Sequence, residues 1–267
     1  MESIFSGDSY ESSTKKGLPF IHYLFLGTRW GMYFTFIKDI VFRYRREVID
    51  GNYDDQQWVK SSQESLQIVE RFGGRFVIRG MDNLKGEDGP YVIIANHMST
   101  LETAVLPGIV RPHMPVTFVV KRKLTEGNVF GHIMRSRDPI AVDRVNPRED
   151  LATVLKEGEE KLKKGISIII FPQSTRTAEF RPERFNSLGI KLAIRAGVNV
   201  IPIALKTDFW GEGSIIRGFG RISRKKKIHI EIGSPIAPQG RGKNEHQEIV
   251  DFIQSRLNTW EKEDNAG

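Results

Sequence analysis

The 267-residue sequence contains no cysteine, which excludes both disulfide bonds and thiolate chemistry. The absence is typical of proteins from a reducing compartment. The sequence also lacks an internal repeat, a zinc-ligand spacing and an RNA-binding motif of the RNP type. With 39% hydrophobic and 27% charged residues, it is typical of a globular chain that can bury a sizeable core.

The balance of charge is basic. The sequence has 40 Lys and Arg residues against 33 Asp and Glu residues, which gives a net charge of +7 and an isoelectric point near 9.5. Such a surface favours an anionic partner, namely an anionic membrane, a phosphorylated ligand or nucleic acid. Ordinary solubility is the alternative explanation, because this excess is modest for the length. Since no nucleic-acid-binding motif accompanies the charge, we predict a membrane or a metabolite as the partner and no nucleic acid.

Neither a secretory signal nor a membrane-spanning run is evident. Residues 1–17 are polar, and we predict that they form a flexible tail. A spanning helix needs about 20 predominantly apolar residues. The longest uncharged run in the aromatic stretch 18–42 extends only from Trp30 to Ile37.

Residues 18–46 are rich in aromatic side chains and end in the basic sequence FRYRR. Aromatic residues next to basic ones are typical of a segment that lies in the headgroup region of a membrane. A pair of core helices packed on the rest of the protein is the alternative. We predict the interfacial arrangement, with a helical membrane-associating segment over residues 18–72. The protein would then be peripheral or monotopic at the cytoplasmic face of a membrane and would contact its lipids through residues 18–46.

Short apolar runs alternate with helical patterns through the rest of the chain. Asn146 can cap a helix over 147–164, Pro147 suits its first turn, and Gly165 can end it. Further helices are predicted at 58–72, 187–196 and 244–260. Strands are predicted at 75–79, 91–95, 116–120, 140–142, 166–171, 200–205 and 228–232. This alternation predicts an α/β domain over residues 73–267, in which helices flank a central, mostly parallel sheet.

The sequence NHMSTLE follows the strand predicted at 91–95 and places His97 five residues before Glu102. Ser99 and Glu102 fit a capping box, in which both side chains accept hydrogen bonds from backbone N–H groups at a helix start. A catalytic dyad of His97 and Glu102 is the other interpretation. It requires His97 to stand outside the helix, because residues five apart on a helix do not face each other. A cap at Ser99 would allow this.

In such a dyad the carboxylate fixes the tautomer of the imidazole, and the other ring nitrogen acts as a general base toward a hydroxyl. The sequence has neither a cysteine nor a G-x-S-x-G motif to supply a protein nucleophile. The nucleophile would therefore belong to the substrate.

Two later loops carry weaker signals for an anion site. Arg144 ends the sequence PIAVDR and could hold a phosphate, or it could be a surface residue paired with Asp143. The sequence FPQSTRT (171–177) brings hydroxyls, backbone N–H groups and Arg176 into one short loop, which fits an anion site as well as an ordinary polar turn. In α/β folds of this kind, ligands bind beyond the carboxyl ends of strands, where these loops lie.

The predicted strand VIPIAL contains Pro202. Proline within a strand indicates an edge, a bulge or a place where another group approaches the backbone. With the three loops above, it completes a set of four motifs in a defined order.

This ordered set resembles the PlsC-type glycerolphosphate and lysophospholipid acyltransferases. The family's blocks are Asn-His-x-Ser-x-x-Asp, a run ending in Asp-Arg, Phe-Pro-Glu-Gly-Thr-Arg and a hydrophobic Val-x-Pro-Val run. They correspond here to NHMSTLE, PIAVDR, FPQSTR and VIPIAL. The sequences KRKL (121–124) and FNSLGIKLAIRAG are also similar to family segments. Each block alone is weak, but the set is specific and covers about residues 70–235.

The resemblance implies an O-acyltransferase of phospholipid biosynthesis. The enzyme would move a fatty acyl group from acyl-CoA or acyl-carrier protein to the hydroxyl of a lysophosphatidate-like acceptor, without a metal or other cofactor. His97 would be the general base, Glu102 would orient it, and loop donors would stabilise the developing oxyanion. The resemblance assigns substrate binding to Asn96, Ser99, Lys121, Arg144, Gln173, Ser174, Thr175 and Arg176, with the two arginines at the acceptor's phosphate.

The sequence departs from the family pattern at three places. Glu102 replaces an aspartate, Gln173 and Ser174 replace a glutamate and a glycine, and Pro139 stands where glycine is common. The missing carboxylate at position 173 leaves other acceptors open, such as a lysophospholipid, an aminolipid or a glycolipid. A non-catalytic lipid-binding scaffold on the same fold is a further alternative, although the retained His97 and its carboxylate favour an enzyme.

Overall fold

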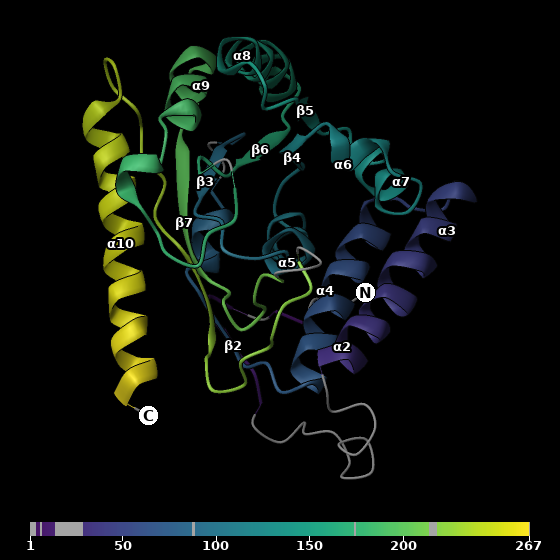
Figure 1. Cartoon of the computed structure of the whole chain (residues 1–267). Coiled ribbons are helices and arrows are strands. Elements are labelled where there is room, and N and C mark those ends of the chain that lie inside the picture. The colour runs from purple at the N-terminus through teal and green to yellow at the C-terminus, as the bar shows by residue number, and fades with distance from the viewer. Residues whose placement is uncertain are drawn as a thin grey trace.

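A computed structural model describes residues 4–5, 7–13, 29–86, 89–173, 175–213 and 218–266. Within these residues the chain forms an eight-stranded sheet in the order β1-β2-β8-β7-β3-β6-β4-β5 (Figure 1). The five strands from β7 to β5 run parallel, whereas β8 and β2 run in the opposite direction. The strands are Tyr10–Glu11 (β1), Phe76–Arg79 (β2), Val92–Ala95 (β3), Val116–Lys121 (β4), Ile140–Val142 (β5), Ser167–Ile170 (β6), Val200–Lys206 (β7) and Ile228–Ile232 (β8).

Helices cover both faces of the sheet and make two separate cores (Figure 1). Successive residues of a strand point to opposite faces, so Ile93 of β3 packs into one core and Val92 and Ile94 into the other. The helices are α2 (Arg29–Phe36), α3 (Arg43–Ile49), α4 (Asp55–Arg71) and α5 (Leu101–Val110) in the first layer, α6 (Lys123–Glu126) and α7 (Phe130–Arg135) beside it, and α8 (Pro147–Lys163), α9 (Leu188–Ala196) and α10 (Lys243–Ala266) on the other face.

The predicted α/β fold with a mostly parallel sheet is confirmed. The seven predicted strands are present as β2 to β8, each within one residue of its expected bounds. Helix α8 begins as expected, because the side chain of Asn146 accepts a hydrogen bond from the backbone N–H of Arg148. Gly197 ends α9 in a left-handed conformation with φ of +67°, which glycine adopts without steric cost.

Strand β1 was missed in the sequence analysis because it lies in the segment predicted to be a flexible tail. Tyr10 pairs with Ile78 of β2, and the hydroxyl of Tyr10 donates a hydrogen bond to Glu70 of α4 (2.6 Å). The flexible-tail prediction is therefore wrong for Tyr10 and Glu11, whereas residues 14–17 lie outside the described part of the chain. A strand of two residues is too short to show a period, and its partners are distant in sequence.

Pro202 lies in β7, inside the sheet rather than at its edge. The antiparallel pairing of β7 shifts by one residue next to Pro202. Ile203 pairs with Ile232 of β8, whereas Val200 pairs with Ile236, which follows β8. Such a shift is a bulge, and the proline stands next to it. Of the three predicted explanations for Pro202, the bulge is the one observed.

Residues 29–49 form one continuous helical segment, in which a π-helical stretch (η1, Ile37–Phe42) joins α2 to α3. One side of this segment is buried, including Tyr33, Phe36 and Tyr44. The opposite side exposes three aromatic side chains: Trp30 (54% exposed), Phe34 (64%) and Phe42 (53%). The buried side packs as the core-helix alternative describes, and the interfacial arrangement of the exposed side stays a prediction. No helix among the described residues has the length and apolar character needed to cross a membrane.

Candidate active site

Five strand ends meet at one edge of the sheet. Strands β3, β4, β5, β6 and β7 run parallel, so the residues that follow them lie together. Two hydrogen bonds join the loop after β3 to the loop after β6. The backbone N–H of His97 donates to Oε1 of Gln173 (2.7 Å), and the backbone N–H of Thr177 donates to the carbonyl of His97 (3.0 Å). Motifs that are distant in sequence therefore form one site.

At the centre of this site, Nδ1 of His97 is hydrogen-bonded to Oε2 of Glu102. Glu102 is fully buried, whereas 14% of the His97 side chain is exposed. Glu102 lies in the first turn of α5, and His97 stands outside that helix, as the dyad requires. Because Glu102 engages Nδ1, the Nε2 atom is the ring nitrogen left for a substrate proton.

The other oxygen of Glu102 is held by three donors. Its Oε1 accepts hydrogen bonds from the backbone N–H groups of Met98 (2.8 Å) and Ser99 (2.9 Å) and from the hydroxyl of Thr207 (2.5 Å). The hydroxyl of Ser99 in turn accepts from the N–H of Leu101 (3.2 Å). The helix start is therefore capped by Ser99 and Glu102, and the same carboxylate orients His97. These donors stabilise a buried negative charge that would otherwise be costly.

Phe171 packs against the face of the His97 ring. The two rings stack with centroids 4.3 Å apart and an interplanar angle of 18°. Phe171 directly follows β6, so the same strand end positions this ring and the loop that contains Gln173. The sequence analysis assigned no role to Phe171 or Thr207. An aromatic residue at the end of an apolar strand, and a threonine after one, carry no local signal of a site.

Arg176 lies close to the dyad. Its Nη1 is hydrogen-bonded to the hydroxyl of Thr100, and its Nε pairs with Oε1 of Glu212 (3.0 Å). Partial burial lowers the pKa of the Arg144 guanidinium, the carboxylate of Asp150 opposes this shift, and the nearby positive charge of Arg176 adds to it. The two arginines are therefore close enough to repel each other, which favours an anion between them.

Asp143, the partner that the surface-pair alternative gives to Arg144, pairs with Nε of Arg122 (2.8 Å). Lys121 lies at the same strand ends, because its Cα pairs with Val142, two residues before Arg144. Lys121 and Thr175 are exposed at this edge, and Ser174 lies outside the described residues.

Three residues predicted to bind substrate have partners inside the protein. Asn96 is buried, and its amide exchanges two hydrogen bonds with the backbone of Leu205 (2.7 and 2.8 Å). The buried Ser99 supports the dyad as described above. The amide of Gln173 accepts from His97 and donates to the hydroxyl of Thr177 (2.7 Å). Asn96, Ser99 and Gln173 thus support the site through contacts within the protein, and their assignment to substrate binding stays a prediction.

The role of Gln173 also explains its departure from the family pattern. An amide oxygen accepts the N–H of His97 as a carboxylate oxygen would. Gln173 can therefore take the place of a carboxylate in joining the two loops.

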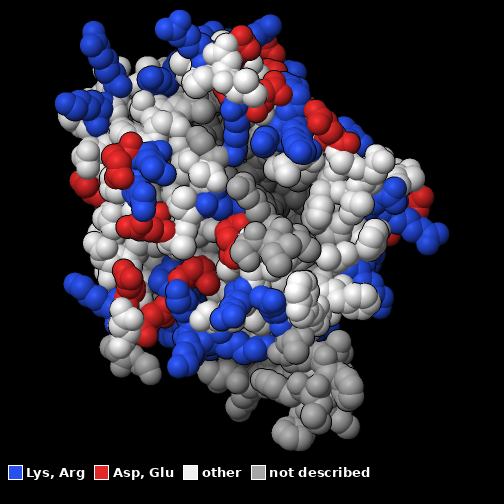
Figure 2. Space-filling view, in the orientation of Figure 1, with Lys and Arg blue, Asp and Glu red and all other residues white. Residues whose placement is uncertain are grey.

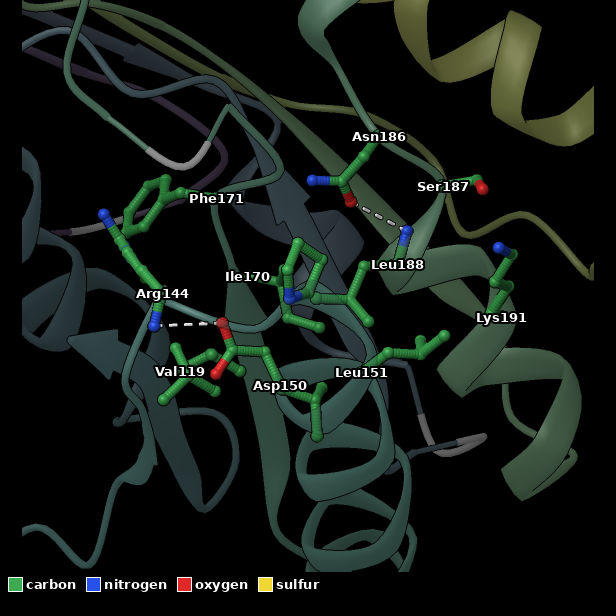
Figure 3. A pocket seen from close by; sticks show the side chains of 13 residues that line it. Val119, Arg144, Asp150, Leu151, Ile170, Phe171, Asn186, Ser187, Leu188 and Lys191 are labelled. Atoms are coloured by element: carbon green, nitrogen blue, oxygen red, sulfur yellow. Dashed lines mark hydrogen bonds between the residues drawn. The ribbon is translucent and has the colours of Figure 1, made fainter. Parts of the chain in front are cut away.

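Two cavities lie near the dyad. The larger has a volume of about 420 Å³ and an apolar floor, with Arg144, Asp150 and Lys191 around it (Figure 3). A smaller cavity of about 110 Å³ lies between the α2–α3 segment and β4 and includes Thr100 and Phe118. Figure 2 shows a hollow in this face of the molecule, with Lys and Arg side chains along its upper rim.

Comparisons with known proteins identify relatives of this chain. Residues 75–206 match the family model described as Acyltransferase. The chain is 31% identical over 239 residues to a 1-acyl-sn-glycerol-3-phosphate acyltransferase of Pseudomonas aeruginosa, covering 89% of this chain and 84% of that protein. It is 24% identical over 163 residues to a lyso-ornithine lipid O-acyltransferase of the same organism, covering 57% of this chain and 61% of that one. The crystal structure of PlsC, the 1-acyl-sn-glycerophosphate acyltransferase of Thermotoga maritima, matches with a TM-score of 0.67 at 20% identity, over 90% of this chain and 96% of that chain.

Proposed function

This chain belongs to the acyltransferase family, as an O-acyltransferase of the 1-acyl-sn-glycerol-3-phosphate acyltransferase type, and on this premise we propose how it works. It transfers a fatty acyl group from acyl-CoA or acyl-carrier protein to the free hydroxyl of a lysophosphatidate-like acceptor, without a metal or other cofactor. The observation that carries the proposal is the hydrogen bond from His97 to a fully buried Glu102, which leaves Nε2 of His97 as a base.

In the proposed mechanism, Nε2 of His97 takes the proton of the acceptor hydroxyl as its oxygen attacks the thioester carbonyl. A new C–O bond forms, and the carbonyl oxygen becomes an oxyanion. When the carbonyl re-forms, the C–S bond breaks and the imidazolium of His97 returns its proton to the departing thiolate. Glu102 stabilises the imidazolium between these two proton transfers.

Arg144 and Arg176 supply the binding site for the acceptor's phosphate. Two guanidinium groups that repel each other gain most from a doubly charged phosphate monoester, because it accepts hydrogen bonds from both. The pair of Arg176 with Glu212 holds one guanidinium in place before the acceptor binds. The phosphate would then anchor the glycerol with its hydroxyl toward His97.

We further propose that the exposed side of the α2–α3 segment rests on a membrane, at its cytoplasmic face. Phe34 and Phe42 project from this side, and Leu124 and Phe130 on α6 and α7 are also exposed. A hydrogen bond from Nε of Arg45 to the carbonyl of Asn128 (2.6 Å) joins the two parts of this surface. The smaller cavity opens among the same elements, so an acyl chain could pass into it from the bilayer.

We expect the double variant Phe34→Asp with Phe42→Asp to lose binding to anionic liposomes. Burying one phenylalanine side chain contributes about 1.5–3 kcal/mol, so removing two should lower the partition coefficient by at least ~10²-fold. Sedimentation with vesicles measures this. Ile194→Asp is the matched control, because it places the same charge on a partly exposed apolar residue of α9, in the opposite layer. Sedimentation of the double variant at the wild-type level would contradict the proposed membrane contact.

The proposed reaction is tested with purified protein, radiolabelled acyl-CoA or acyl-carrier protein, and a panel of acceptors. Lysophosphatidate should give a radioactive diacyl product and the highest kcat/KM. Lysophosphatidylglycerol and lyso-ornithine lipid, which lack a phosphate monoester, should react at least about tenfold less efficiently. The phosphodiester of the first has one negative charge fewer, and the second has no phosphate. A preference for one of these would replace the proposed acceptor, and no transfer from either donor to any acceptor would refute the enzyme.

A further inference from the structure

Arg144 has an unusual backbone conformation for a residue with a side chain. Its φ is +59°, in the left-handed region, and Asp138 is the only other non-glycine residue with a positive φ in the described part of the chain. This conformation brings Cβ too close to the backbone and is disfavoured for most residues. Such a residue persists only where surrounding contacts hold it, and these positions often occur at binding sites.

The carboxylate of Asp150, in the first turn of α8, binds the backbone of this turn. One oxygen of Asp150 accepts the backbone N–H of Asp143 (3.0 Å), and the other accepts the backbone N–H of Arg144 (2.9 Å; Figure 3). Both oxygens of one carboxylate therefore bind two successive N–H groups, which defines the turn between β5 and α8. Because α8 is anchored by buried residues such as Val154 and Leu162, the carboxylate is presented from a rigid element.

The turn decides where the Arg144 side chain lies. In the observed conformation it lines the 420 Å³ cavity next to Phe171 (Figure 3), and it lies near enough to Arg176 for their charges to interact. A change of Arg144 to the right-handed or extended region would turn its Cα–Cβ bond away from this position. The backbone of Arg144 and the position of its charge are thus coupled.

We propose that Asp150 is a positioning residue for the acceptor's phosphate, which acts by holding Arg144 in its left-handed turn. The proposal rests on the proposed function, since the anion is taken to be that phosphate. Asp150 itself repels a phosphate, so its effect on affinity must come through Arg144. Loss of Asp150 lets the turn relax, which spreads the guanidinium over many positions and weakens acceptor binding. The dyad and the thioester are not touched, so the chemical step is unaffected.

The test compares Asp150→Ala, Asp150→Asn, Arg144→Ala and the double variant Arg144→Ala with Asp150→Ala. Asp150→Ala should raise KM for lysophosphatidate about tenfold, with kcat within about twofold and KM for the acyl donor unchanged. Asp150→Asn keeps one acceptor oxygen and should lie between Asp150→Ala and the wild type. The double variant should have a KM no higher than that of Arg144→Ala, because without the guanidinium Asp150 no longer supports acceptor binding and only its repulsion of the phosphate is removed.

Glu149→Ala is the matched control. Glu149 is the neighbouring acidic residue in the same turn of α8, but its carboxylate accepts a hydrogen bond from the side chain of Asn146 (2.7 Å) instead of from the Arg144 turn. Its loss removes one negative charge from the same turn of α8 and leaves the two hydrogen bonds to the Arg144 turn in place, so KM should stay at the wild-type value. An equal rise in KM for Glu149→Ala, or effects of Asp150→Ala and Arg144→Ala that multiply in the double variant, would overturn the proposal.

A binding measurement separates this proposal from the proposed reaction. Titration calorimetry with glycerol 3-phosphate requires no acyl transfer and reports on the phosphate site alone. Weaker binding to Asp150→Ala than to Glu149→Ala would support the positioning role even if no acceptor is acylated. Equal affinity for both variants, or no binding to the wild type, would refute it. If circular dichroism shows that Asp150→Ala does not fold, Asp150→Asn replaces it in the comparison with Glu149→Ala, because asparagine has nearly the same shape as aspartate.

Discussion

Replacing His97 by alanine is expected to lower kcat for acyl transfer by about 10³-fold, within the range over which a positioned general base accelerates a reaction. The acceptor hydroxyl is a weak nucleophile, and Nε2 of His97 is the base that the geometry offers it. The phosphate site does not involve His97, so KM for the acceptor should change little. Transfer of a radiolabelled acyl group from acyl-CoA to lysophosphatidate measures both constants.

A second histidine provides the control for this prediction. His113 lies in the turn after α5, and its replacement by alanine should leave kcat at the wild-type level. Unfolding followed by circular dichroism shows whether the His97 variant retains its fold, since the stacking of His97 on Phe171 is lost in it. A His97→Ala protein that is folded and retains more than about a tenth of the wild-type kcat would contradict the proposed base.

The sequence predicts the dyad but not what holds it. His97 and Glu102 are five residues apart, so a local pattern contains them both, and the capping motif at Ser99 shows how both can be placed. Thr207 and Phe171 reach the same site from β7 and β6. Their positions depend on how strands are ordered in the sheet, and a single sequence does not encode that order in any local pattern.

The difference between local patterns and contacts distant in sequence also explains which parts of the fold the sequence predicts. Buried parallel strands are continuous apolar runs, so β3, β6 and β7 were found within one residue. The two-residue β1 depends on pairing with β2, which is distant in sequence. At Arg144 the sequence predicted a phosphate ligand, but the turn that aims it forms only because Asp150 accepts two backbone N–H groups, and this contact is visible only in three dimensions.

Replacing Glu102 by glutamine is the second change with a large expected effect, a loss of about 10²-fold or more in kcat. Glutamine has the shape of glutamate, and its carbonyl oxygen can keep the three donors that Oε1 now binds. Its NH₂ group then faces Nδ1 of His97, which must become an acceptor. The ring proton moves to Nε2, and the base is lost without any change in packing.

Two further substitutions separate the orientation of His97 from the stability of the helix start. Glu102→Ala should lose at least as much activity as Glu102→Gln, and it should also lower the melting temperature, because it leaves three buried donors without an acceptor. Glu102→Asp should retain substantial activity, since a shorter carboxylate supports the same tautomer. If Glu102→Gln were as active as the wild type, the carboxylate would serve only to cap α5. A loss in Glu102→Gln at an unchanged melting temperature and an unchanged KM would instead assign that loss to the proton on His97 and to the missing negative charge beside the imidazolium, because the two side chains have the same shape.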